Sequence, residues 1–371
     1  MEFQIDTESL KNGLNKVLTV VDKKSTRPIL AYTLFNIKKD SLELIASDLE
    51  VSVKIILSSY SQDEFSFCIN AKNLFEIVKE LPDAKLELSL RPEKNTLTLR
   101  CGHILYELLI LSSDEFPKLD FANNNAQFEI SSEKLTEIIS KTSHAISTDE
   151  TRIYLNGLFL QEVDSKLRAV ATDGHRLSLL ETELNRHNIE PLQNGVIIPR
   201  KGVSEIKKLV ESFPNEVLKI CLDESFFSIN ASDKYFLSVR LIAREYPKYQ
   251  AVIPQKTTYK LTTDRNSFFD AVRRIKIMSN EKSNGVRIKV FSKEMVISAN
   301  HPSLGNAEEK IEISYNGKDI EIGFNGKYLL DTLSVFDSGE ITMELNNELN
   351  PVLVKSPTHP NFLGIIMPLK L

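Results

Sequence analysis

The chain has 371 residues, of which 42% are hydrophobic, and a formal net charge of −5 at pH 7. This length suits two or three domains of ordinary size, each with its own core. Cys68, Cys101 and Cys221 have no metal-ligand spacing, and such sparse cysteine use is typical of a reducing compartment. The first residues do not form a basic segment followed by an apolar run, as a secretion signal would. The longest apolar stretches are too short to cross a bilayer. We therefore expect a cytoplasmic protein without metal, cofactor or membrane span.

The sequence repeats itself. Glu115-Phe116-Pro117-Lys118 returns 130 residues later as Glu245-Tyr246-Pro247-Lys248. The opening segment Phe3-Gln4-Ile5 matches Phe128-Glu129-Ile130 and, more loosely, Tyr259-Lys260-Leu261. Internal repetition of this kind indicates one structural unit used several times. We predict three domains of one fold, spanning residues 1–125, 126–254 and 255–371, with linkers near the asparagines at 122–125 and at 250–258.

Each repeat divides into two halves that read strand, helix and then several strands. Leu10, Leu14, Val17, Leu18 and Val21 share one helical face. Alternating runs such as 86–90 and 341–345 have the period of half-exposed strands. The fold class is therefore α+β, and six helices are expected at 8–21, 71–81, 132–146, 200–212, 265–278 and 326–336.

The six predicted helices are more basic than the rest of the chain. They contain 15 Lys or Arg and 9 Asp or Glu, a net charge of +6, which leaves −11 on all other residues. Basic helix faces on an acidic body are compatible with a polyanion held along one surface. Ordinary solvated helix surface explains the same numbers, so charge alone leaves both readings open.

The segment from Thr172 to Leu177 attracts attention because Asp173 and His175 lie two residues apart and Ser178 follows. Such residues can serve acid–base or nucleophilic chemistry. However, Asp48 occupies the position of Asp173 in the first repeat, and Asp-Gly between apolar runs is a strong turn signal. We expect Asp173 to form a turn, and the segment Gly174-His175-Arg176, which only the middle repeat has, to serve binding. We find no other enzymatic motif in the sequence.

Several segments together resemble a known family, the bacterial sliding clamp, which is the beta subunit of DNA polymerase III. The segments are 171–177, 196–202, 279–282 with 285–287, and the closing Met367-Pro368-Leu369-Lys370-Leu371. The resemblance covers the whole chain. It implies a DNA clamp fold and a head-to-tail homodimer that closes into a ring, with helices lining the hole and sheets outside. It also implies a non-enzymatic function: the ring encircles double-stranded DNA without reading its sequence and tethers the replicative polymerase.

The same resemblance implies three sets of site residues. A cleft for short apolar peptides of the polymerase III catalytic subunit, the clamp loader and other polymerases and repair proteins is expected at Leu155, Thr172, Gly174, His175, Arg176, Leu177, Pro247, Val252, Ile365, Met367 and Pro368. DNA contacts are expected at Lys24 and Tyr154, and the basic helices add Lys201, Arg273 and Arg274. The dimer interface is expected at Tyr106 and Leu108 against Ile277 and Met278. His103 and Leu105 stand where the family often carries arginines.

Two alternatives belong to other classes of protein. One is a hydrolase that uses Asp173, His175 and Ser178. The other is a monomeric scaffold that binds peptides but never encircles DNA.

Overall fold

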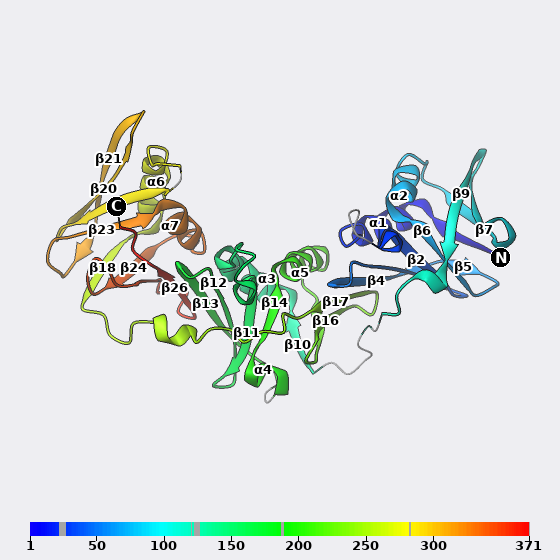
Figure 1. Ribbon diagram of the computed structural model, residues 1–371, viewed down its shortest axis with the longest axis horizontal. Helices are drawn as coiled ribbons and strands as arrows, with labels where there is room; N and C mark the ends of the chain where they lie inside the picture. The colour runs from blue at the N-terminus through cyan, green and yellow to red at the C-terminus, as the bar shows by residue number, and fades with distance from the viewer. Residues whose placement is uncertain (22–26, 120, 122–126, 187–188, 282, 371) are drawn as a thin grey trace. The chain divides into compact units, whose positions relative to one another are not determined.

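The computed structural model describes residues 1–21, 27–119, 121, 127–186, 189–281 and 283–370. The chain forms two compact units, one made of Met1–Glu133 with Ser204–Leu241 and the other of Lys134–Val203 with Ile242–Leu371. Each unit has its own sheets (Figure 1). Helices α3 (Ser132–Thr142) and α5 (Arg200–Ser212) have residues in both units. The predicted linker at 122–125 lies outside the described residues.

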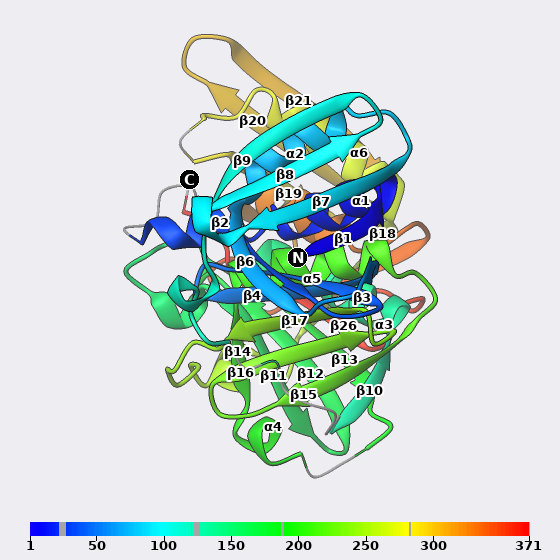
Figure 2. The ribbon, with the colours of Figure 1, turned by 90° about the vertical axis from the view of Figure 1, so that its right-hand side faces the viewer.

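The first unit is built on one antiparallel sheet of 13 strands among its described residues, in the order β10-β15-β16-β17-β4-β3-β2-β6-β9-β8-β7-β1-β5. Figure 2 shows β7, β8 and β9 side by side. The strands are β1 (Glu2–Asp6), β2 (Tyr32–Ile37), β3 (Ser41–Ser47), β4 (Val51–Ser58), β5 (Tyr60–Ser61), β6 (Phe65–Asn70), β7 (Lys85–Arg91), β8 (Thr96–Cys101), β9 (Ile104–Ser112), β10 (Phe128–Ser131), β15 (Val217–Leu222), β16 (Phe226–Ala231) and β17 (Tyr235–Arg240).

Helices α1 (Thr7–Val17) and α2 (Ala71–Lys79) pack side by side beside this sheet (Figure 1). Leu10 and Leu14 of α1 are fully buried, as the helical spacing predicts. The helix ends at Val17, however, and not at Val21. The chain leaves the helix through a turn in which the Val20 N–H donates to the Val17 carbonyl oxygen. Val20 and Val21 remain buried in the turn, so the apolar pattern outlasts the helix that it predicts.

The second unit contains two antiparallel sheets among its described residues. One has nine strands in the order β14-β11-β12-β13-β26-β25-β24-β18-β22, and the other has four in the order β21-β20-β19-β23. The strands are β11 (Gly157–Val163), β12 (Lys166–Thr172), β13 (Arg176–Glu183), β14 (Val196–Pro199), β18 (Tyr259–Asp264), β19 (Gly285–Val290), β20 (Glu294–His301), β21 (Gly305–Glu312), β22 (Ser314–Tyr315), β23 (Ile320–Asn325), β24 (Glu340–Leu345), β25 (Val352–Lys355) and β26 (Phe362–Ile366).

Helices α6 (Arg265–Lys276) and α7 (Gly326–Leu333) pack together in this unit. Each begins at a side-chain cap that satisfies a free backbone N–H. The Asp264 carboxylate accepts from the Ser267 N–H at 2.8 Å, and the Asn325 side chain accepts from the Lys327 N–H at 2.9 Å. The six predicted helices are all present. None of the helices in the described part of the chain is long and apolar enough to cross a membrane.

Helix α4 (Glu190–Asn194) and the 3₁₀ helix η6 (Tyr249–Val252) of this unit were not expected from the sequence. Helix α4 has a proline near its start and ends at Gly195, whose φ is +81°. A Cβ at Gly195 would lie 2.2 Å from the ring of Phe159, so the position requires glycine. The 3₁₀ helix η6 begins where the predicted linker 250–258 was expected to be irregular.

Candidate functional site

A tight turn joins β12 to β13 at the centre of the expected cleft. One carboxylate oxygen of Asp173 accepts from the backbone N–H groups of His175 and Arg176, at 2.9 and 3.0 Å. The Thr172 hydroxyl accepts from the Gly174 N–H at 3.1 Å, and Gly174 has a φ of +89°. Asp173 is therefore a turn former, as predicted, because its oxygen replaces the partners that a short loop leaves missing.

The first unit contains the same turn between β3 and β4. Asp48 accepts from the N–H groups of Glu50 and Val51 at 2.9 and 2.7 Å, and the Ser47 hydroxyl accepts from the Leu49 N–H at 2.9 Å. Leu49 has a φ of +74°, the strained conformation that Gly174 adopts freely. The shared backbone hydrogen bonds show that the sequence repeat is a structural repeat.

Arg176 ties this turn to helix α7. Its guanidinium donates to Asp173 at 3.1 Å, to Asp331 of α7 at 2.6 Å and to the backbone oxygen of His144 at 2.5 Å. The same group lies 4.3 Å from the centre of the Tyr328 ring, which is close enough for a cation–π interaction. With only 7% of its surface exposed, Arg176 is a buried charge held by two carboxylates. These contacts fix the turn against α7.

The side chains of the hydrolase alternative do not assemble into a catalytic group. The Ser178 hydroxyl is 99% buried and contacts Nε2 of His144 at 2.9 Å, whereas His175 is exposed with its ring near that of Tyr328. Burial, and then the positive charge of Arg176, lower the pKa of His144 to about 4. Because Ser178 is buried away from solvent, the Ser178–His144 contact is structural.

An apolar cluster lies under the expected cleft. It contains the predicted residues Leu155, Leu177 and Ile365, all at most 5% exposed. Tyr246 and Tyr249 also belong to it, and the Tyr246 ring stacks on Phe159 with 4.5 Å between ring centres. The cleft expectation omitted both tyrosines. The repeat of Glu115-Phe116-Pro117 as Glu245-Tyr246-Pro247 was the available signal, since a repeated aromatic position indicates a core contact.

The other expected cleft residues lie nearer the surface. Gly174, His175, Pro247 and Val252 are exposed, and Val252 keeps 46% of its surface accessible. Thr172 is buried, and Met367 and Pro368 are half-buried. The chain after β26 does not fray: the N–H of Met367 donates to the His175 oxygen at 2.8 Å and that of Leu369 to the Gly323 oxygen at 2.7 Å. Pro368 itself has no N–H to donate, but the next residue, Leu369, pairs with Gly323 of β23.

The expected DNA contacts have mixed surroundings. Tyr154 is 37% exposed on the 3₁₀ helix η5 (Ile153–Leu155), and Lys201 is exposed near the start of α5. On α6, Arg273 pairs with Asp270 at 3.0 Å but stays 63% exposed, whereas Arg274 makes two hydrogen bonds to Glu309. Lys24 lies outside the described residues. Of Arg273 and Arg274, Arg273 has the more accessible charge.

The expected interface residues lie at exposed apolar edges. Along residues 104–109, β9 pairs with β8 and has no second strand partner among the described residues. Tyr106 is 37% exposed on this edge, and Leu108 is half-buried. Ile277, which follows α6, is 73% exposed, and Met278 is half-buried. Leu105, which the resemblance places at the seam, is 58% exposed, and the neighbouring Ile104 and Leu109, which were not expected there, are exposed as well.

Comparison with known proteins covers the whole chain. Residues 1–120, 129–248 and 250–370 match the models of the N-terminal, central and C-terminal domains of the DNA polymerase III beta subunit. The chain belongs to the DNA polymerase III beta subunit family. It is 33% identical to a beta sliding clamp of Caulobacter vibrioides and 31% identical to one of Pseudomonas aeruginosa, over all of both chains in each case.

Solved structures agree. The crystal structure of the DNA polymerase III subunit beta from Pseudomonas aeruginosa matches with a TM-score of 0.93 at 29% identity, and that of the DNA polymerase sliding clamp from Caulobacter crescentus with 0.93 at 31%, each covering both chains completely. The predicted clamp fold is confirmed. The family's role is that of a sliding clamp, a processivity factor without catalytic activity, so this member is a clamp and not an enzyme.

Proposed function

We propose that two copies of this clamp close head to tail into a ring that encircles duplex DNA in the cytoplasm and tethers the replicative polymerase. The observation that carries the proposal is the match, in order and over the full length, to the three domain models of the beta subunit. The three matched ranges also support clamp domains at 1–125, 126–254 and 255–371, and the repeated turns at Asp48 and Asp173 support the likeness of the first two.

Encirclement suits a weak and uniform attraction to DNA. Exposed cations such as Arg273 and Lys201, with Tyr154 and Lys24, would lie at a screened distance from the phosphates. An attraction that hardly changes along the DNA axis permits sliding, and the closed ring prevents escape. Release then requires a clamp loader that opens the ring.

The seam of the ring is proposed between the β9 edge of one copy and the α6 end of the other. An unpaired strand edge with exposed apolar side chains attracts another strand, and a closed ring removes that liability. Tyr106 and Leu108 would face Ile277 and Met278. Because Leu105 is apolar and 58% exposed, we expect this seam to depend on burial more than on charge.

The cleft over the apolar cluster is proposed to hold short apolar peptides from the polymerase III catalytic subunit, the clamp loader and other polymerases and repair proteins. Leu155, Leu177 and Ile365 would form its floor. Val252 and Met367 offer accessible apolar surface at the rim. An apolar surface with few polar groups is the usual site for such ligands.

Retention on DNA of different topology tests the proposal. The clamp is loaded onto a nicked circle with its loader and the circle is then linearised. We expect the protein to stay on the circle and to leave the linear duplex within the time of a gel filtration run. Equal retention on both forms would mean adhesion, and a monomeric mass at working concentrations would exclude the ring and favour a peptide-binding scaffold.

A further inference from the structure

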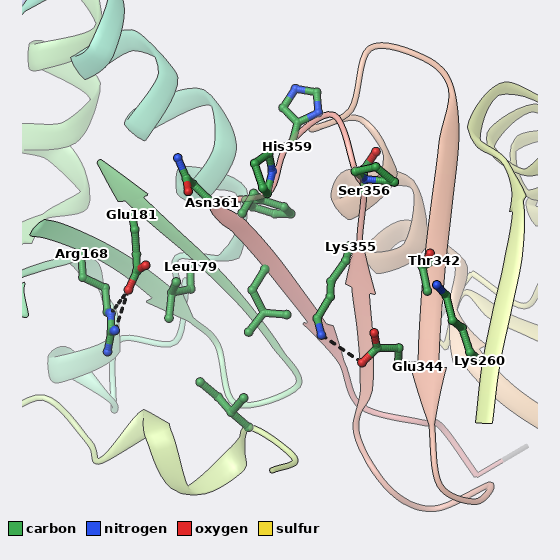
Figure 3. Close-up of a pocket in the computed structure, with 15 residues that line it drawn as sticks. Arg168, Leu179, Glu181, Lys260, Thr342, Glu344, Lys355, Ser356, His359 and Asn361 are labelled. Atoms are coloured by element: carbon green, nitrogen blue, oxygen red, sulfur yellow. Dashed lines mark hydrogen bonds and ion pairs between the residues drawn. The ribbon is translucent and has the colours of Figure 1, made fainter. Parts of the chain in front are cut away.

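A pocket of about 500 Å³ is lined mainly by strands of the nine-stranded sheet, beside the proposed cleft. Its walls come from β12, β13, β18, β24, β25 and β26 and from the loop at 356–361. Figure 3 shows its two sides: Arg168 and Glu181 on one, and Lys355, Glu344 and Lys260 on the other. No site expected from the sequence includes these five residues.

The pocket is continuous with the apolar cluster under the cleft. Leu179 and Leu363 line it and are paired across β13 and β26, two residues along from the cleft pair Leu177 and Ile365. Two residues along a strand span about 7 Å, which is the spacing of successive side chains on one face. The floor of the pocket therefore lies about 7 Å from the floor of the proposed cleft. Ile253 also lines the pocket and directly follows Val252. A peptide anchored in the cleft reaches the pocket within a few extended residues.

The charged groups of the pocket differ in their availability. Arg168 donates twice to one oxygen of Glu181, at 2.9 and 2.6 Å, and once to the Tyr249 hydroxyl at 3.4 Å. Lys355 is held by Glu344 at 2.9 Å. The ammonium of Lys260 is exposed and has no ion pair among the described residues. Three cations face two carboxylates, so the pocket keeps one unneutralised positive charge.

We propose that this pocket binds the acidic flank of the same peptide whose apolar anchor occupies the cleft, with a partner carboxylate on Lys260. The inference depends on the proposed cleft and names a second feature that its partners share. The ion pairs of Arg168 and Lys355 keep the floor in place, and Leu179 and Leu363 contact the peptide stem. The occupant is acidic because the available group is a cation.

Matched peptides test this. Capped peptides share one apolar pentamer of leucine and phenylalanine and carry, before or after it, three glutamates or three glutamines. For one of the two flank positions, the one that reaches the pocket, we expect the glutamate peptide to bind the wild-type clamp roughly three- to tenfold more tightly than its glutamine twin. This gain in affinity should be lost at high salt. In Lys260→Gln the gain should vanish while the affinity for the glutamine twin is unchanged.

Two further variants make the result specific. Lys293→Gln removes one exposed charge from the turn between β19 and β20, away from the pocket, and should keep the gain. Lys260→Glu should reverse the preference towards a lysine flank. A gain that survives in Lys260→Gln, or equal binding of both twins to the wild type, overturns the inference alone. Failure of every peptide to bind the wild type overturns the proposed cleft, and the inference with it.

Discussion

The junctions β13–β26 and β4–β17 have matching places in the repeat but different chemistry. Leu177 and Ser52 each lie four residues after their turn aspartate. Leu177 pairs with Ile365 across one junction, whereas Ser52 pairs with Ser238 across the other. Ser52 is hydrogen-bonded to Ser47 at 2.8 Å, and Ser238 to Ser228 at 3.1 Å. One backbone scaffold thus has an apolar floor in the second unit and a polar floor in the first. The side chains therefore decide which junction suits an apolar ligand.

The largest expected effect comes from a change at Arg176 in the β13–β26 junction. The matching residue of the β4–β17 junction is the fully buried Val51. Arg176→Val leaves Asp173 and Asp331 without their cation. We expect the free energy of unfolding of this unit to fall by roughly 3–5 kcal/mol in urea titrations. Adding Asp331→Ala should restore part of the loss. A fall below 1 kcal/mol would show that the guanidinium is not what holds the turn to α7.

Leu177→Ser gives the β13–β26 junction the residue type that Ser52 supplies at the β4–β17 junction. Loss of a buried side chain should lower the free energy of unfolding by roughly 2–4 kcal/mol and also weaken peptide binding. Leu177→Ile, which keeps the volume, is the matched control, and fluorescence anisotropy of a labelled peptide measures the affinity. Unchanged affinity in a folded Leu177→Ser clamp would mean that the cleft floor does not contact the ligand.

His144 should make the stability of the second unit depend on pH. The first unit has Thr19 at the matching place and lacks this contribution. A histidine whose pKa falls from 6.5 to about 4 on folding stabilises the protein above pH 6.5, and that contribution is lost as the pH falls through this range towards 4. At pH 5 the loss amounts to roughly 2 kcal/mol. Urea unfolding at pH 7 and pH 5 should show it in the wild type, and His144→Gln should lack it.

The smallest effect is expected for Ser238→Ala in the first unit. The change leaves the buried Ser228 hydroxyl without its partner, which costs about 1 kcal/mol. The double variant Ser228→Ala with Ser238→Ala should recover most of this loss. Neither change should affect peptide binding, and a weaker peptide affinity would show that the polar junction also contributes to the ligand site.

Local patterns predicted the repeat, the six helices and the turn aspartates, because each depends on spacing along a short segment. Contacts between distant residues were beyond such reasoning. Arg176 and Asp331 are 155 residues apart, and only the fold brings them together. The cleft side chains came from resemblance, while the place of Tyr249 in the apolar cluster depends on how η6 lies on the sheet. The end of α1 was misplaced because buried valines continue beyond the helix.

The serine pair Ser52–Ser238 also bears on how many partner proteins one clamp could hold at once. This polar floor does not suit an apolar peptide, so with the proposed cleft as the peptide site each copy would hold one partner at a time. A ring of two copies would then hold two partners at most. A third partner would bind only after one of the two dissociates. Exchange would then depend on the residence time and the local concentration of each partner.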